Sequence, residues 1–184
     1  MRILAAIALT AISMIFGAND AAKGDTIPVT INGVEIRVGE ETLQEMNEKL
    51  GLMIDDDCVD EDSNTITLMT INDDDKITAV VDNEKVCEIC VDCSNRTYRY
   101  AYYDGKASEA KTKRNEIVTI GGVCIGDSDE EMRNVFGEPT FVGSFNDGFS
   151  EHIEYEFKDG YLLVFENTGG VIDYMSISKT SNDY

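Results

Sequence analysis

The chain has 184 residues, of which 42% are hydrophobic, and this is enough to build one compact domain or two small ones. Its formal net charge is −21, which repels phosphate backbones and anionic lipid headgroups. Binding to nucleic acid or to membrane surfaces in general is therefore disfavoured. A basic protein partner or a cation is favoured instead.

Residues 1–22 have the pattern of a bacterial secretory signal peptide. Arg2 gives a positive start, and the apolar run from Ile3 to Ala18 is short for a membrane span. We expect a secreted or cell-surface protein with no membrane attachment beyond the export signal. The alternative is an uncleaved N-terminal anchor, which also leaves the bulk of the chain outside the cytoplasm.

Residues 25–93 predict a first unit made of a hairpin, a short helix and a sheet. Asn32-Gly33 lies between alternating apolar residues, which is a strong hairpin signal. Thr42 and Glu45 have the spacing of a capping box, and Gly51 ends the helix. The strands expected after this helix span 65–71, 76–81 and 85–91.

Residues 116–184 predict a second unit of the same kind. Here Gly121-Gly122 forms the turn, and Ser128 with Glu131 forms the capping box. The pattern Val29-Thr-Ile-x-Gly-Val-x-Ile36 recurs as Val118-Thr-Ile-x-Gly-Val-x-Ile125, which favours a tandem duplication. The strands expected after the second helix span 152–157, 161–167 and 171–178.

The predicted fold class is α+β, with two related units that each contain a β-hairpin, a short capped helix and an antiparallel sheet. Alternation in the second unit puts Ile153, Tyr155 and Phe157 on one face of a strand. The opposite face is polar, as in an antiparallel sheet with one solvated side. If the units are independent, a chain cut near Lys111 leaves two fragments that each keep a sheet.

Residues 94–115 predict a Tyr-rich strand followed by a basic linker. Alternation places the tyrosines of this strand on one face, and a tyrosine offers a large rigid surface with a polar tip. The candidate partner-binding residues are Tyr98, Arg99, Tyr100 and Tyr102. In the alternative interpretation, the same tyrosines cover the core of an ordinary strand.

Clustered carboxylates suggest a calcium site, since calcium prefers oxygen ligands. The candidate metal ligands are Asp55, Asp57, Asp60 and Asp62. The register that begins at Asp60 lacks the central glycine and the closing glutamate of an EF-hand loop, so solvated acidic turns are the alternative. The only histidine, His152, shares a face with Glu154 and Glu156, but a zinc site normally needs further nitrogen or sulfur ligands.

The five cysteines leave three interpretations open. The run from Cys87 to Cys93, with Cys58 or Cys124, could supply four thiolates to a metal, although export favours disulfides. Strand positions three apart are separated by roughly 10 Å, so a bridge from Cys87 must reach another segment, and Cys58 is the nearest candidate. Buried cysteines without any bond are the third interpretation.

Gly126-Asp-Ser-x-Glu-Glu-Met-x-x-x-Phe-Gly-Glu-Pro139, followed by Tyr155-Glu-Phe and Val164-Phe-Glu, resembles the beta-lactamase inhibitory protein-like group. It is also similar to the small lipoprotein of the outer-membrane barrel-assembly machinery. The resemblance covers residues 116–178 well and residues 27–91 loosely. It implies helices packed on an antiparallel sheet, often in tandem, that bind proteins without catalysis.

The sequence therefore predicts an exported, non-enzymatic protein-binding module of the bacterial envelope or exterior, with no cofactor. No nucleophile motif, phosphate loop or paired-carboxylate signature stands out. One alternative is a calcium- or other metal-binding envelope protein. Another is an inhibitor of a secreted hydrolase, which the resemblance alone suggests.

Overall fold

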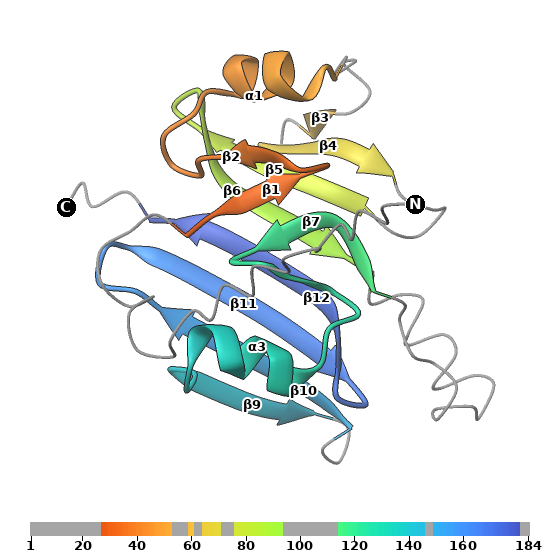
Figure 1. Cartoon of the computed structure of the whole chain (residues 1–184). Helices are drawn as coiled ribbons and strands as arrows, with labels where there is room; N and C mark the ends of the chain where they lie inside the picture. Colours follow the sequence, from red (N-terminus) through yellow and green to blue (C-terminus); the bar gives the residue numbers. More distant parts are fainter. Residues whose placement is uncertain are drawn as a thin grey trace, which may run out of the picture.

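The structure is a computed structural model, and it describes residues 27–52, 59–60, 64–70, 76–93, 114–145 and 149–180 (Figure 1). In the first half of the chain, the elements are β1 (Val29–Ile31), β2 (Val34–Ile36), α1 (Leu43–Leu50), β3 (Val59–Asp60), β4 (Thr65–Thr70), β5 (Lys76–Asp82) and β6 (Lys85–Asp92). In the second half they are β7 (Asn115–Ile120), β8 (Val123–Ile125), α3 (Asp129–Phe136), β9 (Phe141–Phe145), β10 (Ser150–Glu156), β11 (Tyr161–Thr168) and β12 (Val171–Lys179).

Two antiparallel sheets dominate the fold, so the predicted α+β class is confirmed in its coarse form. The large sheet has eight strands in the order β3-β4-β5-β6-β12-β11-β10-β9. The small sheet has four strands in the order β2-β1-β7-β8. In each sheet, the strands of the first half of the chain lie together on one side and those of the second half on the other.

The small sheet and both helices lie on one face of the large sheet (Figure 1). The small sheet crosses its centre, α1 lies toward β3 and β4, and α3 lies toward β9 and β10 (Figure 1). The backbone of Gly39 donates to Val86 at 2.7 Å, and that of Gly126 donates to Ile172 at 2.9 Å. These bonds tie the segment before each helix to the large sheet.

The turns, capping boxes and helix ends predicted from short sequence motifs are present in the structure. Asn32 and Gly33 have φ of 51° and 76°, and Gly121 and Gly122 have φ of 59° and 89°, as tight hairpin turns require. Both capping boxes are present, since each N-cap side chain accepts from the N3 backbone and each N3 glutamate accepts from the N-cap backbone. Each helix ends at a glycine, Gly51 or Gly137.

Buried side chains of both halves form one hydrophobic cluster, in which Ile31, Ile89, Ile120 and Phe165 are at most 1% exposed. β1 pairs with β7, and β6 pairs with β12. Tyr161 of β11 also donates to the Val38 carbonyl at 3.1 Å. Because the halves share both sheets and a core, the expectation that each half keeps its sheet alone is no longer favoured.

Six predicted strands agree with β4, β5, β6, β10, β11 and β12 to within two residues at each end. Two strands were not predicted. β3 is a pair of residues, and β9 interrupts its apolar run with Gly143. These two missed strands lie at the opposite edges of the large sheet.

Candidate protein-binding surface

The β9 edge of the large sheet is the candidate functional surface. β9 pairs with β10 along its whole length and is last in the strand order of the large sheet. In the part of the chain that the structure describes, no strand pairs with its other side. The last strand of a sheet presents alternate backbone N–H and C=O groups outward.

Large hydrophobic side chains are exposed along this strand. Phe141 is 52% exposed, Val142 42% and Phe145 57%. Phe141 lies opposite Glu154 of β10, and Gly143 lies opposite His152. Because directly opposite residues share a face of a sheet, Phe141 and Phe145 lie on the face that carries His152. Val142, opposite the buried Ile153, lies on the other face.

Gly143 allows the Phe141 ring to lie against the backbone of its own strand. A Cβ placed on Gly143 would be 3.1 Å from Cε1 of Phe141, which is closer than most real Cβ contacts. The Phe145 ring approaches the same point at 3.8 Å. The glycine therefore lets the two exposed rings flank a stretch of bare backbone.

His152 links two carboxylates on the face that it shares with Phe141. Its Nε2 lies 2.9 Å from Oε1 of Glu154, and its Nδ1 lies 3.2 Å from Oε1 of Glu166. The Phe141 and His152 ring centroids are 6.4 Å apart in an edge-on arrangement. Sequence alternation predicted Glu154 beside this histidine, but the second partner is Glu166 of β11 and not Glu156.

The two carboxylates favour the charged imidazolium. Partial burial lowers the pKa of His152, but the hydrogen bonds and charges of Glu154 and Glu166 raise it by more, so its pKa lies above the ordinary 6.5. With both ring nitrogens protonated, each nitrogen donates to one carboxylate. The pair of acids is then bridged by a single positive charge.

A packed aromatic cluster supports this end of the sheet from its other face. Phe136 of α3 lies 5.5 Å from the Tyr155 ring and 5.6 Å from the Phe165 ring, measured between centroids. The Tyr155 hydroxyl donates to the Gly137 carbonyl at the end of α3 at 3.1 Å, and burial raises its pKa to about 12. β9 therefore lies beside a strand that the core holds in place.

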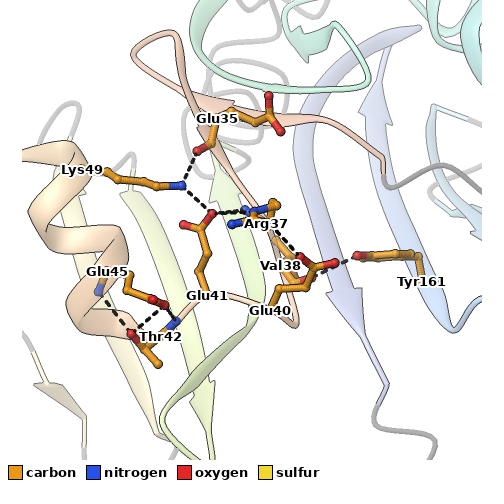
Figure 2. Close-up of polar contacts among 9 residues, drawn as sticks. All are labelled: Glu35, Arg37, Val38, Glu40, Glu41, Thr42, Glu45, Lys49 and Tyr161. Carbon is orange, nitrogen blue, oxygen red and sulfur yellow. Dashed lines mark hydrogen bonds and ion pairs between the residues drawn. The ribbon is translucent and has the colours of Figure 1, made fainter.

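A second polar cluster stabilises the fold at the start of α1 (Figure 2). Glu41 is 3% exposed, and its Oε1 accepts from Lys49 Nζ at 2.6 Å and from Arg37 Nε at 3.2 Å. Thr42, the next residue, forms the capping box with Glu45 (Figure 2). The acid thus joins α1 to the segment that follows β2.

Asp127 has the corresponding position before α3. It is 4% exposed, it pairs with Arg114, and its Oδ2 accepts from the Cys124 backbone at 3.0 Å. Burial is the largest of several effects that raise the pKa of the neighbouring Cys124 thiol to about 12. Both buried acids are therefore interpreted as structural.

Most of the predicted site residues lie outside the described ranges. These are Tyr98, Arg99, Tyr100, Tyr102, Asp55, Asp57, Asp62 and Cys58. Asp60 is described, and it is exposed at the end of β3. The partner-binding and calcium interpretations of these residues therefore stay predictions.

Cys87 is a free thiol whose Sγ lies 3.3 Å from the Val80 carbonyl oxygen, to which it donates. Cys90, Cys93 and Cys124 are also free. Cys87 therefore forms no bridge in this structure, and its candidate pairing with Cys58, which lies outside the described residues, stays a prediction.

Within the described ranges, no group of three or more His, Cys, Asp or Glu side chains is arranged to hold a metal ion. The triplet of His152, Glu154 and Glu156 considered above is therefore not brought together as a ligand set. None of the helices in these ranges has the length and apolar character needed to cross a membrane.

No protein-family model and no curated protein matches the chain. Among solved structures, it is similar to a crystal structure of YjgB, a DUF4309 family protein from Bacillus subtilis. The sequence identity is 12% and the TM-score is 0.44, over 78% of this chain and 82% of that chain. A likeness of this size assigns neither a family nor a function.

Proposed function

We propose that the chain is an exported, non-enzymatic protein-binding module of the bacterial envelope or exterior. The observation that carries the proposal is the β9 edge, where Phe141, Val142 and Phe145 are each more than 40% exposed. Exposed aromatic side chains clustered at a sheet edge are typical of interaction surfaces and costly to leave in water. The export signal expected in residues 1–22 supplies the location.

We further propose that the chain consists of two related units that arose by tandem duplication. Equivalent backbone hydrogen bonds support this. Val86 donates to Glu41 and Ile172 donates to Asp127, both at 2.9 Å. Leu43 donates to Glu84 at 3.2 Å, and Asp129 donates to Gly170 at 3.4 Å. In each half, the residues around the N-cap thus contact the last hairpin of that half in the same way.

The registers between the halves support the same proposal. β1 and β7 pair as Val29 with Ile120, Thr30 with Thr119 and Ile31 with Val118. Val29 thus lies opposite the sequence equivalent of Ile31, and Ile31 lies opposite the sequence equivalent of Val29. Thr30 and Thr119 are equivalent to each other, and their hydroxyls lie 2.9 Å apart. Such reciprocal pairing is the geometry of an isologous two-fold interface.

The large sheet repeats this reciprocity between β6 and β12. Counting from the equivalent residues Val86 and Ile172, Cys90 corresponds to Ser176, and these two residues lie opposite each other. Ile89 lies opposite Ile177, and Val91 lies opposite Met175. The proposed duplication therefore places both shared pairings around one local two-fold axis.

The binding proposal is tested by a pull-down from bacterial envelope extract with the purified mature chain, once with calcium and once with a chelator. We expect one protein to be retained in both conditions. The variant Phe141→Ser/Phe145→Ser should lose it, because the exposed rings supply the apolar contact.

The matched control is Glu48→Gln/Glu84→Gln, which changes two exposed residues of the first half and should retain the protein. Circular dichroism and the melting temperature confirm that each variant is folded. Retention of no protein by the unaltered chain would contradict the binding function. Retention with calcium alone would favour the metal-binding alternative.

A further inference from the structure

We propose that β9 accepts an extended, basic segment of a partner protein as an additional strand of the large sheet. The inference rests on the protein-binding function proposed above and specifies both the surface and the chemistry of the partner. Addition of a strand uses main-chain hydrogen bonds for affinity and alternate side chains for specificity. β9 offers both.

The backbone of β9 lacks the features that normally protect an edge. Its sequence, Phe-Val-Gly-Ser-Phe, contains no charged residue and no proline, and natural proteins use these residues to prevent pairing at exposed edges. The strand is held at full length by β10 on its inner side. Its outer side therefore presents a row of backbone donors and acceptors.

The side chains of β9 provide apolar contacts on both faces of an added strand. Phe141 and Phe145 lie on one face, with the bare backbone of Gly143 between them. Val142, which is 42% exposed, lies on the other face, toward which α3 packs (Figure 1). Since successive side chains of a strand point to opposite faces, a partner with apolar residues can pack against both.

The negative charge around β9 favours a basic partner. The described residues of 129–168, which include α3, β9, β10 and β11, contain nine Asp or Glu residues, against Arg133 and Lys158. Glu154 and Glu166 lie on the face of the two phenylalanines, with side chains 30% and 44% exposed. Lysine or arginine side chains on the added strand would lie among these carboxylates and pair with them.

The same charge argues against a second copy of this chain as the occupant. Antiparallel pairing of β9 with β9 would bring two acidic sheet ends together, each on a molecule of net charge −21. Like charges placed opposite one another destabilise an interface. Self-association through β9 is therefore a test outcome and not the proposal.

The test measures the binding of three fluorescent peptides to the mature full-length chain. The probe is an alternating Lys-Val peptide, and one control is the alternating Glu-Val peptide. The other control is the Lys-Val peptide N-methylated at every residue, which keeps the charge but removes the backbone donors of both edges. We expect the first peptide to bind at least about tenfold more tightly than either control.

Hydrogen exchange locates the binding site, and we expect new protection of β9 amides. Phe141→Ser/Phe145→Ser should weaken binding about tenfold. Glu154→Gln/Glu166→Gln should weaken it roughly fivefold in low salt, whereas the control Glu48→Gln/Glu84→Gln should leave it unchanged.

Equal binding of the N-methylated peptide, protection away from β9, or a β9-mediated dimer in light scattering would each overturn the inference. Any of these outcomes would overturn the inference about β9 without contradicting the proposed protein-binding function. A chain that retains an envelope protein but does not bind the Lys-Val peptide at β9 remains a binding module that uses another surface.

Discussion

At the candidate surface, the protonation of His152 depends on two neighbouring carboxylates. Glu154 is its sequence neighbour on the strand face, and Glu166 reaches it from β11. Because the chain contains one histidine, its protonation can be followed without assignment of other residues. The residue therefore reports on the geometry of the surface.

We expect an NMR titration of His152 to give a pKa above 6.5, since the two carboxylates favour the imidazolium more than burial opposes it. Glu154→Gln or Glu166→Gln should each lower this pKa by removing one partner. Glu48→Gln is the distant control. A wild-type pKa at or below 6.5 would show that the three side chains do not meet as described.

The same pKa has a consequence for stability. A raised pKa in the folded state means that folding favours the protonated form. The contribution of His152 to stability is therefore fully present below pH 6.5 and disappears as the pH rises through the raised pKa. The difference in melting temperature between the wild type and His152→Gln should accordingly shrink as the pH is raised above about 6.5.

At the scale of elements, the two hairpin turns have the same backbone but different surroundings. Gly33 and Gly122 have φ of 76° and 89°, and a Cβ at either position would meet no atom within 4 Å. Gly121 has φ of 59°, and a Cβ there would lie 2.7 Å from Cζ of Phe136. The second hairpin is thus packed directly against the end of α3.

Replacing each glycine with alanine separates the cost of the positive φ from the cost of the clash with Phe136, and a denaturant titration measures both. We expect Gly33→Ala and Gly122→Ala to lower the free energy of unfolding by about 1–2 kcal/mol, the cost of a left-handed conformation. Gly121→Ala should cost more, because it also displaces Phe136 from Tyr155 and Phe165. Equal losses at Gly121 and Gly122 would contradict the Phe136 contact.

Elements that depend on near neighbours could be predicted from the sequence. The Asn32-Gly33 turn and the Thr42 and Ser128 capping boxes are short-range, and each is present. β9 could not be predicted, because Gly143 interrupts its short apolar run. Its exposed phenylalanines were missed for the same reason, and Glu166 was missed because a cross-strand contact leaves no local signal.

At the scale of the whole molecule, the pairings that join the halves were also missing from the prediction. β1 with β7 and β6 with β12 connect residues far apart in the chain, and no hydrophobic period encodes such a register. The predicted helices and six of the predicted strands are present, but the prediction treated the halves separately. It did not account for the shared sheets.

These shared pairings revise what is expected when the chain is cut near Lys111. Each fragment would expose the strands that face the other half, β1 and β6 or β7 and β12. We expect neither fragment to be a stable monomer, and we expect mixing to restore the sheet signal in circular dichroism.

The second-half fragment should also associate with itself, because reciprocal registers allow β7 to pair with β7 and β12 with β12. Light scattering measures the size of the product, and a dimer is expected. Two folded monomeric fragments would contradict both the shared core and the proposed two-fold relation.

The joining of the halves in one chain also makes their association independent of dilution. If the two surfaces belonged to separate molecules, the complex would dissociate below its dissociation constant. Within one chain, each half meets the other at an effective concentration in the millimolar range, whatever the amount of protein in solution. The chain therefore keeps its sheets at high dilution, and with them the orientation of the β9 edge.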